Sequence, residues 1–310
     1  MLNKIIKYRN NILIKGSIWM TAGGLLASFG NYLFHLVMGR LLSPAEYGAL
    51  AALMSLSIIV SLPSTIILTV TTKFSGEYHA QGQKKKLKRF ASKMMFYSAF
   101  MSIGVILLFV ISNEFIQSYL KIYNVNLIIL TGIIVSVGFI SSVQQGVYRG
   151  LLYFRLITIF LIVGVLLKLL LGWQLVVGGY ALTGALIAIL TSSIIVFFVS
   201  MLPIRKIFTF TTKKFDDMKK NVISFSYPTL LMSITITLMT TLDLILVKHY
   251  FASSDAGIYA ASSLIGKSIY YALVPISTVL FSVIVNKYAK KQSVQKEILL
   301  SLLITAVPGL

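Results

Sequence analysis

The chain contains no cysteine and few other residues suited to catalysis. The lack of cysteine excludes disulfides, cysteine metal ligands and a thiol nucleophile. The three histidines, His35, His79 and His249, lie far apart and show no metal-binding spacing. There is also no phosphate-binding glycine loop, no recognisable Ser-His-Asp order and no pair of carboxylates. These absences argue against an ATPase or a glycosyltransferase. We therefore predict that the chain is not an enzyme and binds no cofactor.

Charge is also scarce, because only 12% of the 310 residues are charged and 57% are hydrophobic. A soluble domain carries about 25% charged residues, so the deficit indicates a surface that faces lipid. Backbone polar groups in hydrocarbon must pair internally, and long apolar runs therefore predict helices of about 20 residues. Such runs lie at 14–38, 46–70, 93–112, 126–147, 154–173, 179–201, 222–249 and 257–285, and another begins near 297. We expect an all-α, polytopic membrane protein with at least eight spans.

The 28 basic residues outnumber the 8 acidic ones, giving a formal net charge of +20. Such a charge is also found in nucleic-acid-binding proteins, but here the basic residues cluster between the apolar runs. With a cytoplasmic N-terminus, 23 of them fall on the inner side and 3 on the outer side, as the positive-inside rule requires. The run Lys84–Arg89 is interpreted as a cytoplasmic retention signal that touches anionic lipid. We therefore expect a multi-pass protein of the cell membrane that binds no nucleic acid.

A weak internal repeat relates two segments that lie 209 residues apart. This shift lays Leu41–Ala52 on Tyr250–Ala261 and aligns an acid, a glycine and an Ala-Ala pair. Six spans separate the copies, so both enter the membrane in the same sense and form a parallel repeat. The repeat predicts a first six-helix bundle over 1–208 and the start of a second over 209–310. Two full copies would need more than 310 residues, so we expect a fragment, truncated in the second bundle.

Three short segments carry a resemblance to a known family. Gly39–Gly48 resembles the region between the first two spans of bacterial polysaccharide transporters, which are lipid-linked oligosaccharide flippases of the multidrug/oligosaccharidyl-lipid/polysaccharide exporter superfamily. Gln145–Gly150, followed by Tyr153–Arg155, is similar to the family's pattern between spans four and five, and Asp255–Ala261 to its start of span eight. The resemblance implies two six-helix bundles around a central cavity. It also implies export or flipping of sugar units carried on a polyprenyl (di)phosphate.

The acids of the repeated motif have a structural interpretation. Ser43 is followed by proline and, three residues on, by Glu46, the pattern of a capped helix start. Asp255 lies in the first turn of the second copy, where Ser253 or Ser254 is expected to cap the helix. We interpret both acids as helix-start residues in preference to ligands of a coupling ion.

Lys267 is the leading candidate for a functional residue. It lies ten residues past Gly257, roughly 15 Å along the helix, too deep for easy snorkelling. Its helical neighbours Ser263, Tyr270 and Ser277 form one polar stripe. A lysine costs about 2.5–3.5 kcal/mol at the centre of a membrane, so one that is retained usually faces a cavity or a partner. We predict a cation that lines the substrate cavity; burial in a structural pair is the alternative.

Other charged residues in or near the spans allow several interpretations. Lys168 either lines the cavity or snorkels to the outer interface, and Arg40 either anchors the first span or marks the cavity mouth. Arg149 fits the positive-inside rule, but an arginine at the inner mouth also suits a diphosphate. Asp243 is the one carboxylate clearly inside a predicted span. Three roles are predicted for this carboxylate as alternatives: binding of a coupling cation, an ion pair with Lys267, or a position at the membrane interface.

The favoured hypothesis is a transporter that flips a phosphate-bearing, lipid-linked oligosaccharide by alternating access, with Lys267, Lys168, Arg40 and Arg149 in its cavity. Its expected partners are this substrate, membrane lipids, and glycosyltransferases and a polymerase of the same pathway. A cation-coupled exporter of small amphipathic molecules is the alternative, and it would depend on Asp243. A membrane scaffold or receptor without transport is a third hypothesis, which neither the intramembrane lysine nor the repeat excludes.

Overall fold

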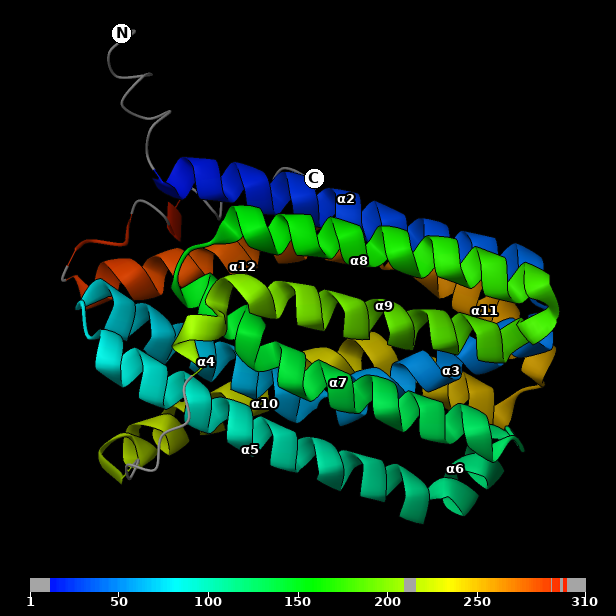
Figure 1. Cartoon of the computed structure of the whole chain (residues 1–310). Coiled ribbons are helices and arrows are strands. Elements are labelled where there is room, and N and C mark those ends of the chain that lie inside the picture. Colours follow the sequence, from blue (N-terminus) through cyan, green and yellow to red (C-terminus); the bar gives the residue numbers. More distant parts are fainter. Residues whose placement is uncertain (1–11, 209–215, 291, 296–297, 300–310) are drawn as a thin grey trace, which may run out of the picture.

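The computed structural model describes residues 12–208, 216–290, 292–295 and 298–299, and these residues form helices joined by short turns (Figure 1). The α-helices are α2 (Ile12–Leu41), α3 (Pro44–Val60), α4 (Leu62–Ala80), α5 (Lys84–Ile111), α6 (Asn113–Leu120), α7 (Val125–Gly150), α8 (Phe154–Leu175), α9 (Ala181–Ile204), α10 (Asp216–Tyr250), α11 (Ser253–Gly266) and α12 (Ser268–Ala289). The fold class is therefore all-α, as predicted.

Each of the eight predicted spans coincides with one helix or with two consecutive helices. By length and composition, four helical stretches of the described residues are apolar enough to cross a membrane, or five if the bent pair α3 and α4 counts as one span. One of the four stretches, 154–207, contains both α8 and α9. The protein is thus a multi-pass membrane protein. The predicted ninth span lies almost wholly outside the described residues.

Two predicted spans are broken in the middle. The second span bends by 48° between α3 and α4, and Pro63 lies in the first turn of α4, where its missing N–H costs no hydrogen bond. The eighth span, predicted as one helix over 257–285, is two helices that meet at Lys267. That prediction was wrong because hydropathy averaged over the run does not resolve the short segment Gly266-Lys267-Ser268, at which the helix breaks.

The helices lie roughly parallel (Figure 1), and in chain order they form a first group, α2 to α9, and a second group, α10 to α12. In the first group α2 packs along α8, α8 along α9, and α7 against α9, α4 and α5. The second group, α10, α11 and α12, packs mainly against α2, α3 and α4. Residues far apart in the sequence thus meet where the first two spans contact the seventh and eighth.

The two bent spans approach each other near both of their ends. At the end away from the basic cluster, Gly48 of α3 lies against Gly257 of α11. At the basic end, a Cβ on Gly76 of α4 would lie 3.0 Å from the Val285 side chain and 3.2 Å from the Asn286 amide nitrogen of α12. The two spans therefore contact each other on both sides of their bends.

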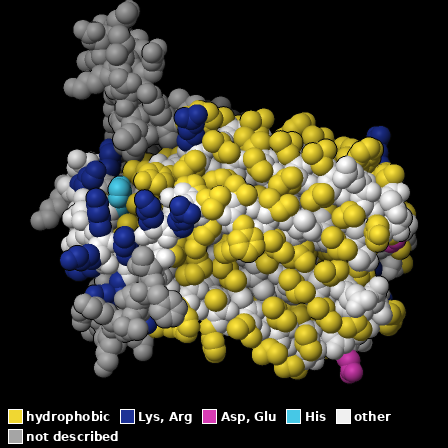
Figure 2. Space-filling model, viewed as in Figure 1, with side chains coloured by type: hydrophobic (Ala, Val, Ile, Leu, Met, Phe, Trp, Pro, Cys, Tyr) yellow, Lys and Arg dark blue, Asp and Glu magenta, His cyan; other side chains and the backbone are white. Residues whose placement is uncertain are grey.

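Basic side chains gather at one end of the molecule, and a broad hydrophobic band covers the face shown in Figure 2. The charged end is where α4 turns into α5, at the run Lys84–Arg89 (Figure 1). This separation of charge from the apolar band is the arrangement that a protein crossing a bilayer with one strongly basic side requires.

Candidate functional site

A cavity of about 90 Å³ lies beside the bends, between α2 and α3 on one side and α10 and α11 on the other. Its polar lining is shared between the two helix groups. His35, Tyr47 and Ser55 come from α2 and α3, and Ser263 and Lys267 come from the eighth span. Apolar side chains such as Met54 and Leu264 complete the wall. Any ligand in this cavity would touch both groups of helices at once.

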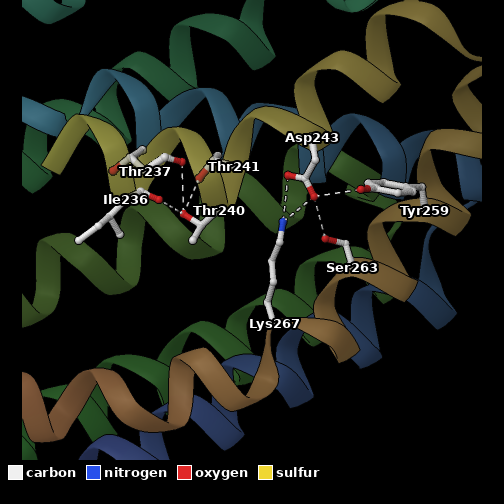
Figure 3. A network of polar contacts seen from close by, with 8 residues as sticks. All are labelled: Ile236, Thr237, Thr240, Thr241, Asp243, Tyr259, Ser263 and Lys267. Carbon is white, nitrogen blue, oxygen red and sulfur yellow. Dashed lines mark hydrogen bonds and ion pairs between the residues drawn. The ribbon is translucent and has the colours of Figure 1, made fainter. Parts of the chain in front are cut away.

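Lys267 forms an ion pair with Asp243 in this region (Figure 3). The lysine Nζ lies 2.9 Å from Oδ1 and 2.8 Å from Oδ2 of the carboxylate. The pair joins the end of α11 to α10. Pairing with Lys267 was one of the three roles predicted for Asp243, and the structure contains that pair.

Asp243 also accepts two hydrogen bonds from α11. The Tyr259 hydroxyl donates to Oδ2 over 3.1 Å, and the Ser263 hydroxyl donates to the same oxygen over 3.2 Å (Figure 3). Tyr259, Ser263 and Lys267 are each four residues apart, so they share one face of the helix. Of the predicted polar stripe, Ser263 and Lys267 share this face, and Tyr259 joins them. The side chain of Tyr270 lies outside the described residues, and Ser277 is exposed on the separate helix α12.

The ion pair remains accessible, because the side chains of Lys267 and Asp243 are 20% and 29% exposed. Its environment is thus unlike that of a dry ion pair enclosed in a protein core. The threonines of α10 that follow the same edge bond to their own helix, for example Thr240 to the Ile236 carbonyl oxygen over 2.9 Å (Figure 3). Among these polar groups, only Lys267 brings a cation to the cavity wall.

His35 and Tyr47 form the opposite wall and were missed by the sequence analysis. The Tyr47 hydroxyl lies 3.5 Å from Nδ1 of His35, and the two rings meet edge to face with centroids 6.2 Å apart. Both residues also line an adjoining cavity of about 320 Å³ between α2 and α11. The one available signal was that His35 is a titratable group inside the first span.

The other three predicted cavity residues do not line this cavity. Lys168 donates to the side-chain oxygen of Asn31 and lies over the Phe34 ring, 4.6 Å from its centroid, between α8 and α2. Arg40 is exposed in the last turn of α2. Arg149 lies in the last turn of α7, and its buried Nε has no hydrogen-bond partner among the described residues. The four cations are thus dispersed because they lie on different helices.

The repeated motif behaves partly as predicted. Ser43 and Glu46 form the predicted capping box: the Ser43 N–H donates to the glutamate over 2.9 Å, and the Glu46 N–H donates to the serine hydroxyl over 3.3 Å. In the second copy neither Ser253 nor Ser254 caps the helix, because the N-cap is Ala252. The Ser253 hydroxyl instead accepts a 2.6 Å hydrogen bond from the buried Lys248 ammonium.

A third cavity, of about 300 Å³, lies within the first group of helices. Amide and hydroxyl groups of α7 and α9 line it together with apolar side chains: Gln144, Gln145, Tyr148, Ser193 and Ser200. Gln144 is tied to α9, since its amide donates to the Phe197 carbonyl oxygen and its oxygen accepts from Ser200. Within the described residues, no group of three side chains could hold a metal ion.

The fold is that of known membrane transporters. The eukaryotic MATE transporter AtDTX14 matches with a TM-score of 0.71 and 13% identity over 95% of this chain and 69% of its own. A MOP superfamily transporter from Pyrococcus furiosus matches with a TM-score of 0.69 and 15% identity, over 94% of this chain and 68% of its own. The Vibrio cholerae MATE transporter VcmN matches with a TM-score of 0.68 and 14% identity, over 90% of this chain and 66% of its own. The chain therefore spans about two thirds of the length of the solved structures it resembles.

The sequence identifies the family more narrowly than the fold does. No curated protein sequence matches the chain. A family model described as polysaccharide biosynthesis protein, in contrast, matches residues 13–286. This match covers nearly all of the helices described above, including both bent spans and the cavity between them. The chain therefore belongs to the polysaccharide biosynthesis protein family.

Proposed function

We propose that this protein moves oligosaccharides linked to a polyprenyl (di)phosphate across the cell membrane, for the synthesis of a surface polysaccharide. Membership in a polysaccharide biosynthesis family supports a glycan cargo. The fold shared with MATE and MOP transporters supports movement across the membrane. Because the cargo carries phosphate, its path needs a cation inside the hydrocarbon layer.

The observation that carries this proposal is the position of Lys267. Its ammonium lines a cavity between two groups of helices and is 20% exposed. A charged group costs several kcal/mol in hydrocarbon, so an accessible one indicates a pathway for ions or substrates. An ammonium offers three hydrogen-bond donors to phosphate oxygens, and a charge-assisted hydrogen bond is roughly twice as strong as a neutral one.

Movement by alternating access fits the two bent spans. They approach each other near the outer end at Gly48 and Gly257 and near the inner end at Gly76 and Val285, with the small cavity between these contacts. Parting one contact while the other stays closed would expose the cavity to one side at a time. The lipid tail would stay in the membrane beside α2 and α11, where exposed Ile258 and Ile265 line the adjoining cavity.

The proposal includes the arrangement predicted from the repeat. The first bundle comprises 1–208, and 209–310 begin a second one, with the N-terminus on the cytoplasmic side. The cargo would be loaded from that side, where glycosyltransferases assemble it, and released to a polymerase on the other. The basic end of the molecule would then face the cytoplasm and its anionic lipids.

Reconstitution of the purified chain into vesicles tests this function. The vesicles contain a fluorescent sugar on a polyprenyl diphosphate, and a membrane-impermeant quencher reports how much of it reaches the outer leaflet. We expect faster exchange than in protein-free vesicles, and no exchange of the same sugar on a polyprenol without phosphate. Equal exchange of both lipids, or ion-driven export of a cationic amphipath in place of the sugar lipid, would contradict the proposal.

A further inference from the structure

We propose that Asp243 is a resident counter-anion for Lys267, which the phosphate of the cargo must displace before transport. The inference rests on the proposed function and specifies how the cargo is recognised. It assigns Asp243 a role other than binding a coupling cation. Asp243 holds the place of the cargo's negative charge while the cavity is empty.

The geometry of the pair is that of an occupied anion site. The Lys267 ammonium contacts both carboxylate oxygens, at 2.9 and 2.8 Å. Two oxygens of one phosphate group present the same kind of charged acceptor to an ammonium. A phosphate that enters the cavity therefore competes with Asp243 for the same donors. The resident carboxylate keeps a partly exposed lysine neutralised at low cost, and it also rejects anions too weak to replace it.

The site is built so that the pair can separate. When Lys267 leaves, Asp243 still accepts hydrogen bonds from Tyr259 at 3.1 Å and Ser263 at 3.2 Å. Without these two donors the carboxylate would be left with an uncompensated charge, which is far more costly than a satisfied one. The two hydroxyls thus lower the cost of releasing the lysine.

Lys267 can also reach a new partner. Its side chain has a flexible four-carbon stem, and it lies at the junction where α11 ends and α12 begins. His35 and Tyr47 line the same cavity from α2 and α3. A phosphate bound by Lys267 would therefore sit beside donors from the first two spans. Displacement of Asp243 would exchange a contact within the second helix group for a contact that bridges both groups.

Binding of farnesyl diphosphate, a short isoprenoid diphosphate, to the purified chain in nanodiscs tests this exchange. Asp243→Asn removes the competing charge but keeps an oxygen that can accept from Tyr259 and Ser263. We expect its Kd to fall about two- to fivefold, the range that a partly exposed ion pair contributes. Tyr259→Phe should raise the Kd by about as much, because the released carboxylate then has one donor fewer. The two variants are expected to act in opposite directions although each removes a contact of the same cluster.

Asp255→Asn is the matched control, because it removes one exposed carboxylate from the first turn of the same helix. It should leave the Kd unchanged, which separates competition at Lys267 from a general change of charge. An unchanged or higher Kd for Asp243→Asn, or an equal decrease for Asp255→Asn, would overturn the inference.

Labelling of Lys267 by an amine reagent gives a second readout. Asp243→Asn should accelerate the labelling, and farnesyl diphosphate should slow it. Identical labelling rates in the wild type and the variant would also contradict the inference.

These outcomes can be separated from failure of the proposed function. If the wild type flips the diphosphate-linked sugar but Asp243→Asn binds no more tightly, the counter-anion role is wrong and the transport function stands. If the wild type neither flips that lipid nor binds farnesyl diphosphate, the function itself is wrong. A melting curve of each variant confirms that the compared proteins are folded.

Discussion

Gly48 of α3 and Gly257 of α11 contact each other reciprocally. A Cβ built on Gly48 would lie 2.7 Å from the Ser253 carbonyl oxygen and 3.0 Å from the Gly257 nitrogen. A Cβ built on Gly257 would lie 2.3 Å from the Pro44 carbonyl oxygen and 3.4 Å from the Gly48 nitrogen. Pro44 and Ser253 are related by the same 209-residue shift as the two glycines. Equivalent atoms of the two copies thus meet each other, as a two-fold relationship between them requires.

The close approach of these two glycines predicts that neither tolerates a side chain. In both cases the added Cβ would meet backbone atoms, which cannot rotate away. Gly257→Ala should therefore lower stability by about 1–3 kcal/mol, the usual cost of overpacking. Thermal unfolding of the detergent-solubilised protein would show this as a lower midpoint.

Gly104→Ala provides the control for this substitution. Gly104 lies inside α5, and a Cβ there would meet nothing within 4 Å. Alanine is favoured over glycine in a helix by about 1 kcal/mol, so the midpoint should stay the same or rise. Equal destabilisation by Gly104→Ala and Gly257→Ala would show that the contact between α3 and α11 is not the cause.

The two copies of the repeated motif differ at the N-cap, which leads to a second prediction. Ser43 caps α3, whereas its equivalent Ala252 offers α11 no side-chain hydrogen bond although its backbone is extended in the same way. Ser43→Ala should lower the free energy of unfolding by about 1 kcal/mol, and Ala252→Ser should raise it by up to the same amount. Urea unfolding of the three proteins would measure both changes. Loss of stability in Ala252→Ser would contradict the assignment of this position as an uncapped helix start.

The orientation in the membrane is tested directly because the chain has no cysteine of its own. Lys86→Cys and Glu114→Cys introduce one thiol each at an exposed position. Lys86 lies in the first turn of α5, and Glu114 lies at the start of α6, just beyond the other end of α5. With a cytoplasmic N-terminus, an impermeant maleimide added to intact cells should label Glu114→Cys and not Lys86→Cys. Permeabilised cells should allow both to be labelled. The reverse pattern would place the basic end of the molecule outside and contradict the positive-inside assignment.

The sequence predicted elements that depend on local or periodic signals. Hydropathy located every described span, and the spacing of Ser43 and Glu46 gave the capping box correctly. The spacing of Ser263 and Lys267 also predicted a shared helix face. The break at Lys267 was missed, because the average hydropathy of the run outweighs its short segment Gly266-Lys267-Ser268.

The contents of the cavity were harder to predict. Helical periodicity shows which residues share a face, but it does not show which helix lies opposite. Lys168 therefore remained a second candidate beside Lys267, although it packs between α8 and α2 against Asn31. For the same reason His35 and Tyr47 were not recognised as the wall that faces Lys267.

The rate at which vesicle-reconstituted protein flips a polyprenyl-diphosphate-linked sugar tests the central claim most directly when Lys267 is varied. Lys267→Ala removes the ammonium and should slow flipping by about tenfold or more, since a hydrogen bond to a charged group contributes about 1.5–3 kcal/mol. Lys267→Arg should retain part of the rate because it keeps the positive charge. Lys121→Gln, which removes an exposed lysine just after α6, should flip at the wild-type rate. A folded Lys267→Ala protein that flips the lipid as fast as the wild type would contradict the account.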